Sequence, residues 1–307
     1  MSHSHGHGHS HSAGSTRGRL AIAFVVTTLV LIIGVIGAWI TGSLALLVDA
    51  AHMLTDAGGL LVALIAATLT LRPASGQRTW GWLRAEVLAA GAQATVLLGV
   101  GGFALVEGVR RWQDPPEIAG PELLIFGAIG LAGNLVSLLV LLSGRNASLN
   151  MRAAFLEVLN DALGSVAVIV SAVVITTTGW TRADAVAGIV IALLIIPRAF
   201  VILKEAGSVL LETAPKGLDV EAVRGHMERK DGVLDVHDLH ATRIDTRTVV
   251  VTAHVVVEPQ RFHDGTAPQI LDDLQECLTE HWGIPVDHAT IQLEPPEHQR
   301  HEPELNH

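Results

Sequence analysis

Long apolar runs alternate with short polar breaks over roughly the first two thirds of the chain. Each run has about the 20 residues that a helix needs to cross the hydrocarbon core of a bilayer. The breaks contain turn residues or charges, as in "RPASGQR" and "QDPPEIAGP". The pattern therefore predicts six transmembrane helices, over Leu20–Ile40, Leu44–Leu71, Ala85–Val109, Leu123–Leu142, Ala153–Thr178 and Ala183–Leu203.

The pattern changes after about Thr213, where the acidic residues behind the formal charge of −10 are concentrated. Alternating apolar residues in "VLDVHDLHATRI" and "TVVVTAHVVVE" predict two strands, and "HATIQLEP" predicts a third. The spacing in "GLDVEAVRGHMERKDG" and "APQILDDLQECLTEHWG" is typical of amphipathic helices. The order α-β-β-α-β indicates a small α+β domain of the ferredoxin-like or metallochaperone-like type with a three-stranded sheet.

Composition also favours a membrane protein. Only 16% of the 307 residues are charged, compared with about 25% in a typical soluble protein. The first apolar run is too long for a cleavable signal peptide, so we interpret it as a transmembrane helix. The single cysteine, Cys277, excludes an intrachain disulfide and zinc sites built on paired cysteines. Any metal must therefore be bound by His, Asp and Glu.

The distribution of Lys and Arg predicts the orientation in the membrane. One side of the predicted bundle, that of the N-terminus, holds Arg17, Arg19, Arg72, Arg78, Arg84, Arg145, Arg152 and Lys204. The other side holds only Arg110, Arg111 and Arg182. We therefore expect a multi-pass protein of the inner or plasma membrane with both termini in the cytoplasm.

Four parts are expected along the chain. The fold class is a membrane all-α six-helix bundle followed by a C-terminal cytoplasmic α+β domain. The end of the chain is polar and is expected to be disordered. The expected parts are a histidine-rich tail at 1–19, the transmembrane domain at 20–204, the α+β domain at 213–295 and a disordered tail at 296–307.

Two pairs of ionisable residues interrupt the apolar runs. His52 and Asp56 are four residues apart in the second run and so share one helix face, and Glu157 and Asp161 repeat this spacing in the fifth. An ionised carboxylate at the helix centre costs about 3 kcal/mol even on a lenient insertion scale. These groups must therefore face the bundle interior, a water-filled cavity or a cation. Two facing pairs can surround one metal ion, although hydrogen bonding between helices is the alternative.

Other polar residues in the runs have simpler interpretations. Asp49 lies near the start of the second helix as a structural or pore-lining acid and is left out of the ligand set. Gln93 and Asn134 are expected to hydrogen-bond across helices rather than line the cavity. Asp184 lies at the start of the sixth helix, where its negative charge is expected to interact favourably with the dipole of that helix.

Several motifs together resemble the cation diffusion facilitator family over most of the chain, in its zinc, cadmium and cobalt efflux branch. They are "SLALLVDAAHMLTDAGGL", "RTWGWLRAEVLAA", "LEVLNDALGSVAVI", "VLLETAPKG", "GVLDVHDLHATRI" and "VTAHVVV". The resemblance implies a homodimeric secondary active transporter, not an enzyme, that exports divalent metal from the cytoplasm in exchange for protons. The implied transport ligands are His52, Asp56, Glu157 and Asp161.

One of these positions departs from the family, whose zinc-type pattern has histidine where this chain has Glu157. The site would then offer one nitrogen and three oxygen donors. Zinc accepts both, whereas oxygen-rich sites also suit manganese. We expect Zn²⁺ as substrate and regulatory ligand, with Cd²⁺ and Co²⁺ also carried, and keep a Mn²⁺ or Fe²⁺ exporter as the alternative.

Exchange of metal for protons follows from the ligand types. Metal binding needs deprotonated ligands and therefore releases protons. An imidazole titrates near pH 6.5, so His52 is an apt proton acceptor. Rocking of helices around a midplane site would give alternating access. No GxxxxGK[ST] motif is present, and we expect no nucleotide, nucleic acid or organic cofactor as partner.

Further histidines suggest accessory metal sites. The N-terminal tract is interpreted as a metal collector or as a plain disordered tail, with His3, His5, His7, His9 and His11 as its ligands. In the tail domain, the resemblance implies a regulatory metal site at His237 and His254. A further ligand is expected from the last strand, either His288 or Glu294, with Gln292 as another candidate. His237 and His240 are three apart, so they are expected on opposite faces of a strand.

Other function classes remain open at this point. An intramembrane metalloenzyme would need a motif such as HExxH, which is not present. A channel fits a four-ligand site less well than a carrier does, because tight binding slows conduction. A membrane metal sensor that signals through the tail would need no ion path across the membrane.

Overall fold

The computed structural model describes residues 10–142, 149–246, 248–280 and 286–299. The chain divides into two compact units. The first contains residues 1–64 and 92–203, and the second contains residues 65–91 and 204–307. Each unit is considered by itself below.

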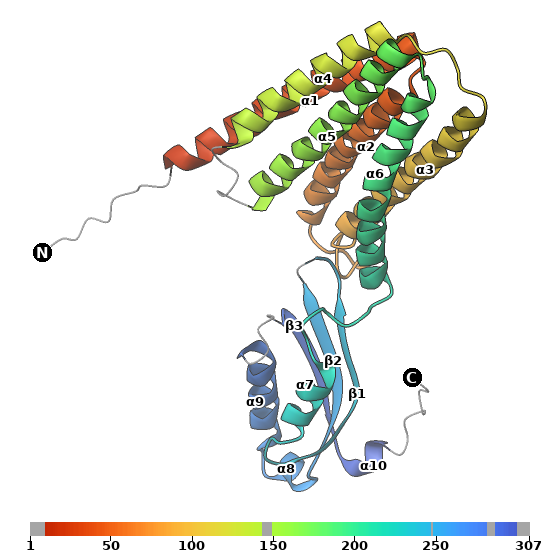
Figure 1. The fold of residues 1–307 in the computed structure, drawn as a ribbon. Coiled ribbons are helices and arrows are strands. Elements are labelled where there is room, and N and C mark those ends of the chain that lie inside the picture. Colours follow the sequence, from red (N-terminus) through yellow and green to blue (C-terminus); the bar gives the residue numbers. More distant parts are fainter. Residues whose placement is uncertain (1–9, 143–148, 247, 281–285, 300–307) are drawn as a thin grey trace, which may run out of the picture. The chain divides into compact units, whose positions relative to one another are not determined.

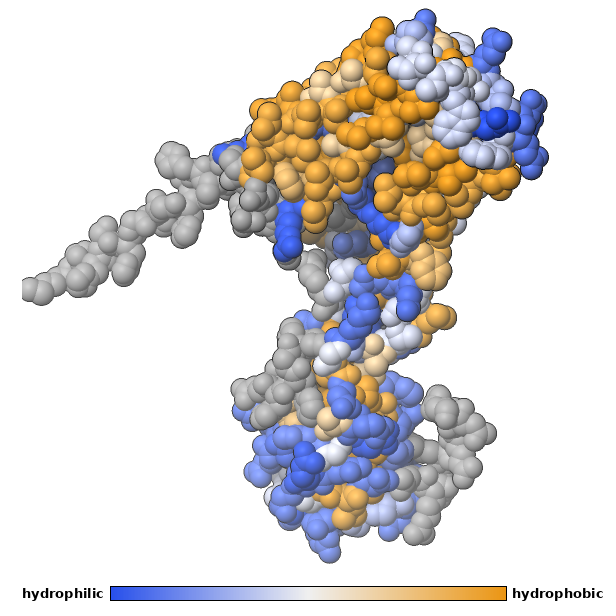
Figure 2. Space-filling model, in the orientation of Figure 1, coloured by the Kyte–Doolittle hydropathy of each residue, from blue (hydrophilic) through white to orange (hydrophobic). Residues whose placement is uncertain are grey.

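Within the described residues, six helices are long and apolar enough to cross a membrane, which confirms the predicted number. Their outer surface is largely hydrophobic (Figure 2). Most begin and end within a few residues of the predicted limits, but the first begins at Ser10 and not at Leu20, and the sixth continues several residues further than expected. They are α1 Ser10–Thr41, α2 Leu44–Thr70, α3 Ala85–Gln113, α4 Gly120–Leu142, α5 Leu149–Thr178 and α6 Arg182–Leu210.

Glycines allow the membrane helices to pack closely. The helices α1 and α4 lie side by side (Figure 1), and Gly37 of α1 contacts the ring of Phe126 of α4 so closely that a Cβ would overlap it. Gly133 of α4 is equally close to Val30 of α1. Small residues at such crossings give van der Waals contact between helices that lipid does not otherwise drive together.

Asp184 lies in the first turn of α6, as expected, and it also stabilises the start of α2. Its buried carboxylate accepts hydrogen bonds from the backbone N–H groups of Leu44, at 2.6 Å, and Ala45, at 3.3 Å, and from the Ser43 hydroxyl. These are donors that the start of α2 leaves unpaired. The α1–α2 turn brings the first residues of α2 against the start of α6, so Asp184 interacts with a second helix besides its own.

The C-terminal part has the predicted α-β-β-α-β order. Its main elements are α7 Val220–Met227, β1 Val233–Arg243, β2 Val249–Val257, α9 Ala267–Glu280 and β3 His288–Glu294, with one-turn helices α8 Gln260–His263 and α10 Pro296–Gln299. The strands lie in the order β1-β2-β3, with β1 antiparallel and β3 parallel to β2. The expected fold class is confirmed.

The helices α7 and α9 cover one face of this sheet. Alternate residues of β2, from Val249 to Val257, join the apolar core formed with α7 and α9. The residues between them, including His254, therefore point to the opposite face. On β3 the same alternation packs the partly buried Ile291 and Leu293 against that core and leaves Glu294 on the face of His254.

A bulge in β1 corrects one expectation. Asp238 adopts φ 50°, and the register shifts between His237, which pairs with His254, and His240, which pairs with Thr252. An extra residue in one strand changes which face the following side chains occupy. His237 and His240 therefore lie on the same face of the sheet and not on opposite faces.

The start of the expected disordered tail is ordered. Pro296–Gln299 form α10, in which the N–H of His298 donates to the carbonyl oxygen of Pro295 at 2.9 Å. A proline at the first helical position has its φ angle already fixed for a helix, which explains why this short turn forms. The rest of that predicted tail, residues 300–307, lies outside the described residues.

The first prediction tests a close approach between α2 and α5. A Cβ at Gly164 would overlap the Asp49 carboxylate, and such overpacking costs about 1–3 kcal/mol. Gly164→Ala should therefore lower the thermal unfolding midpoint of the protein in detergent. Gly58→Ala in α2 is the matched control, because its added methyl group meets open space. Equal midpoints for the two variants would contradict the close approach.

Candidate functional site

Three of the four predicted transport ligands are buried together between α2 and α5. Nε2 of His52 lies 3.4 Å from Oδ2 of Asp56 and 3.9 Å from Oδ1 of Asp161. All three side chains are buried. The imidazole thus lies between two carboxylates that come from different helices, as the matching i, i+4 pairs predict.

Several buried polar atoms of this cluster make no hydrogen bond within the described residues. Nδ1 of His52, Oδ2 of Asp56 and Oδ1 of Asp161 are buried, and none of them has a hydrogen-bond partner among the described residues. Buried polar groups in proteins are nearly always paired with protein or ordered water. Such atoms are suited to bind a cation, since carboxylate oxygens and imidazole nitrogens are metal ligands.

The fourth residue, Glu157, is half-buried on the rim of the cluster. It lines the same cavity as Asp56 and Asp161, and its Oε1 is 3.7 Å from Nη2 of Arg198 on α6. Arg198 was not singled out from the sequence, although a lone arginine inside an apolar run is a recognised sign of function. Glu157 is therefore shared between the ligand cluster and a cationic side chain.

A cavity of about 400 Å³ adjoins the cluster. Asp56, Glu157 and Asp161 contribute its acidic lining, and apolar side chains of α1 and α4 such as Phe24 and Leu141 line the remainder. A space of this size can hold water, and water beside ionisable groups lowers the cost of keeping them within an apolar bundle. The cavity offers a hydrated approach to the carboxylates.

The four transmembrane groups do not close on a single point. In the part of the chain that the structure describes, the only group of three or more His, Cys, Asp or Glu residues with one ligand atom each within 4.8 Å of the others is elsewhere, at His237, His254 and Glu294. Closing the transmembrane group on one ion would require the carboxylates to move closer together.

The neighbouring polar residues bond across helices, as predicted. Gln93 of α3 donates to Oδ1 of Asp56 at 3.4 Å, and Asn134 of α4 donates to the hydroxyl of Ser165 of α5 at 3.2 Å. The first contact is long and the second is of ordinary length. Gln93 thereby orients a candidate ligand, whereas Asn134 acts as a link between helices.

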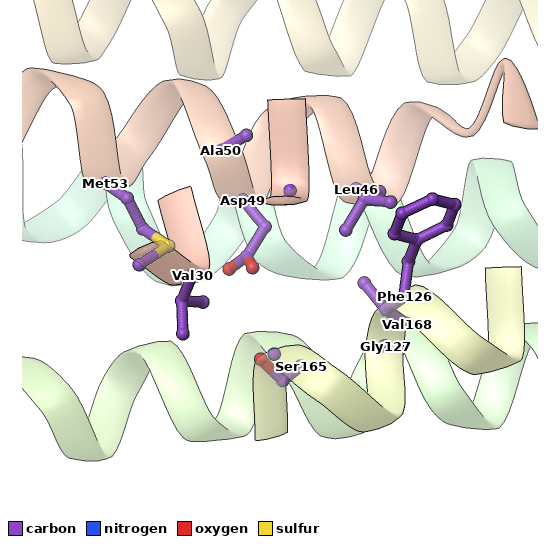
Figure 3. A pocket seen from close by; sticks show the side chains of 11 residues that line it. Val30, Leu46, Asp49, Ala50, Met53, Phe126, Gly127, Ser165 and Val168 are labelled. Atoms are coloured by element: carbon purple, nitrogen blue, oxygen red, sulfur yellow. The ribbon is translucent and has the colours of Figure 1, made fainter. Parts of the chain in front are cut away.

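Asp49 faces a separate small cavity. Its buried carboxyl group points from α2 into the space bordered by Val30 and Ser165 (Figure 3). The cavity measures about 10 Å³, which is near the smallest volume that holds one water molecule. This separation agrees with leaving Asp49 out of the ligand set.

The tail domain brings three of its candidate ligands together on the face of the sheet opposite α7 and α9. Nε2 of His237 lies 2.9 Å from Oε1 of Glu294, and Nδ1 of His254 lies 3.7 Å from Oε2. The register places His237 opposite His254 on neighbouring strands, and only 1% of Glu294 is exposed. Gln292 donates a hydrogen bond to Oε2 of Glu294 at 3.0 Å, which helps to fix the orientation of this carboxylate.

The remaining histidine candidates lie apart from this group. His288 packs edge-on against Trp80 with ring centroids 5.3 Å apart, and it is not in the three-residue group found among the described residues. His11 falls in α1. The other four residues of the N-terminal tract, His3, His5, His7 and His9, lie outside the described residues.

Family models match both parts of the chain. The cation efflux transmembrane domain matches residues 20–211, and the cytoplasmic domain of cation efflux proteins matches residues 215–296. This chain belongs to the cation diffusion facilitator family. The resemblance seen in the sequence motifs is thereby confirmed, and the protein is a membrane protein of a metal cation transporter family.

Individual relatives in the family are similar over nearly the whole chain. The metal cation efflux system protein CzcD of Cupriavidus metallidurans is 39% identical over 92% of this chain and 87% of its own length. The zinc transporter ZitB of Escherichia coli is 39% identical over 95% of this chain and 92% of its own. The cadmium, cobalt and zinc/H(+)-K(+) antiporter of Bacillus subtilis is 36% identical, with 93% and 91% covered.

The second prediction tests the three-residue group of the tail domain. Glu294→Gln should weaken zinc binding by the full chain, measured in an Asp161→Asn background that disables the transmembrane ligands. Loss of a ligand should reduce zinc affinity by at least about tenfold, since replacing a residue that only hydrogen-bonds to a metal ligand already has an effect of that size. His288→Ala is the control and should leave the affinity unchanged. Equal effects of the two substitutions would contradict the assignment of Glu294.

Proposed function

We propose that this protein exports divalent metal cations from the cytoplasm in exchange for protons, as a secondary active transporter. Zn²⁺ is the main proposed substrate, with Cd²⁺ and Co²⁺ also carried. The observation that carries this proposal is the set of buried, unpaired ligand atoms of His52, Asp56 and Asp161 within an apolar helical bundle. A metal cation that crosses the membrane through this bundle would bind these atoms and act as their missing partner.

The ligand chemistry supports exchange rather than permanent binding. Carboxylates and imidazole bind metal only when deprotonated, so protons entering from outside compete with the metal for the same atoms. The spread of the four groups, with Glu157 on the rim, favours a site that opens and closes around its ion. Rocking of α2 and α5 against the other helices would expose the site to each side in turn.

The identity of the metal rests on the relatives and on the donor set. The relatives' names give zinc, cadmium and cobalt, and this supports the same metals here. The carboxylate of Glu157 adds a hard oxygen donor, which favours manganese or iron more than an imidazole would. A Mn²⁺ or Fe²⁺ exporter is therefore the second candidate, and a membrane metal sensor is the third.

The remaining parts are assigned regulatory and assembly roles. His237, His254 and Glu294 would bind a regulatory Zn²⁺ on the sheet face opposite α7 and α9, and the domain at 213–295 would join two copies of the chain. The name of the matched cytoplasmic model agrees with a cytoplasmic tail domain. The Lys and Arg distribution agrees with both termini inside an inner or plasma membrane. The N-terminal histidines would collect metal at the cytoplasmic entrance.

The third prediction tests the transport site. Asp161→Asn should reduce zinc uptake into proteoliposomes under an imposed pH gradient by at least about a hundredfold, because an amide cannot replace the charge of a metal-binding carboxylate. The variant should still insert into the membrane. Ser171→Ala on the same helix is the control, since this hydroxyl has no hydrogen-bond partner among the described residues. Undiminished uptake by Asp161→Asn would rule out this site.

The fourth prediction concerns the departure from the family pattern. Glu157→His should raise the ratio of zinc to manganese transport, because imidazole is a softer donor than carboxylate. It should also change the pH profile of transport, since imidazole and carboxylate titrate over different ranges. Competitive flux of the two metals over about pH 5.5 to 8, where histidine titrates, measures both effects. If ratio and profile are both unchanged, Glu157 is not a ligand.

A further inference from the structure

We propose that Arg198 is a tethered counter-cation of the transport site that offsets the extra charge of Glu157 and competes with the metal for its carboxylate. The inference rests on the proposed function and deepens it. Arg198 touches no metal in this role. It acts through Glu157 and is therefore a positioning residue that sets how strongly the site holds its ion.

The geometry places a fixed positive charge in an ion pair with Glu157. Nη2 of Arg198 lies 3.7 Å from Oε1 of Glu157, and their side chains are 38% and 26% exposed, respectively. Arginine stays protonated in proteins, so its charge does not depend on pH. It lies in the apolar stretch "IIPRAF" of α6, where a charged residue is costly unless it is paired.

Charge counting explains why Glu157 requires such a partner. The carboxylates of Asp56, Glu157 and Asp161 carry a formal charge of −3 when ionised, and Arg198 brings the sum to −2, with His52 neutral. A divalent cation neutralises a site of −2 completely. A site with histidine in place of Glu157 would have −2 without any arginine. Arg198 therefore offsets the extra negative charge that glutamate brings at a position where the family has histidine, and the net charge of the site returns to −2.

The consequence for transport is a limit on affinity. Without Arg198 the ionised site would hold a dication at a net charge of −1, and Glu157 would be free to bind the metal fully. At effective dielectric constants near 20, a positive charge several ångströms from a dication repels it appreciably, and partial exposure of Arg198 reduces that repulsion. Binding should then be tighter, and release on the far side should become the slow step.

The test compares four forms of the full-length protein in lipid nanodiscs and in proteoliposomes. Arg198→Gln should tighten zinc binding and lower the KM for zinc by roughly tenfold, and it should also lower the maximal rate. Glu157→His, which leaves the site at −1 with Arg198 in place, should raise the KM. The double variant returns the site to −2 and should recover the maximal rate lost in Arg198→Gln.

Two controls separate this role from a structural one. Arg198→Lys keeps the charge and should resemble the wild type. Arg110→Gln removes an exposed arginine of α3, whose side chain is 79% exposed, and should change neither KM nor rate. A merely structural Arg198 would lower the rate without lowering the KM, and the double variant would then be worse than either single variant.

The inference is overturned if Arg198→Gln leaves zinc affinity unchanged or weakens it, or if the double variant fails to recover the rate. Its failure is distinguishable from failure of the proposed function. If the wild-type protein binds zinc through Asp161 but moves none across the liposome membrane, then the proposed transport is wrong. Equilibrium zinc binding by the four forms still decides the role of Arg198, because that measurement needs no flux.

Discussion

An ionised carboxylate inside an apolar bundle is stable only when water, a proton or a positive charge lies beside it, and the transmembrane unit places three such groups at one level. Asp56, Glu157 and Asp161 each lie beside a side chain that can interact with a carboxylate. Asp56 and Asp161 flank the imidazole of His52, while Glu157 faces Arg198. The adjoining cavity supplies the remaining solvation. Burial of these carboxylates costs free energy because they need a positive charge nearby, and the same need favours the binding of a dication.

Much of this arrangement was predictable from the sequence, because each prediction rested on a strong local pattern. Runs of about 20 apolar residues predict spans without reference to their neighbours, and the i, i+4 spacing places His52 with Asp56 on one face. The order of strands and helices in the tail was equally predictable from periodicity. These patterns are properties of single elements, and the structure retains them.

What the sequence left out depends on contacts between elements. The capping of α2 by Asp184 needs the α1–α2 turn to meet the start of α6, and no local pattern records that meeting. The pairing of Arg198 with Glu157 likewise joins α5 to α6. The bulge at Asp238 was missed for another reason, because its φ of 50° has no signature such as a glycine and reverses the expected faces of the residues that follow.

The two candidate metal sites use similar donors in different states of closure, and their surroundings explain why. In the tail domain, Glu294 holds His237 at 2.9 Å and is oriented by Gln292, so the three donors lie close together before any metal arrives. Between α2 and α5 the donors are spread, and one of them is held by an arginine. A preorganised site favours retention of its ion, since little rearrangement opposes binding. A site that must release its ion at every cycle benefits from donors that are spread apart. A cation within the protein, such as Arg198, then pairs with the Glu157 carboxylate again when the metal leaves.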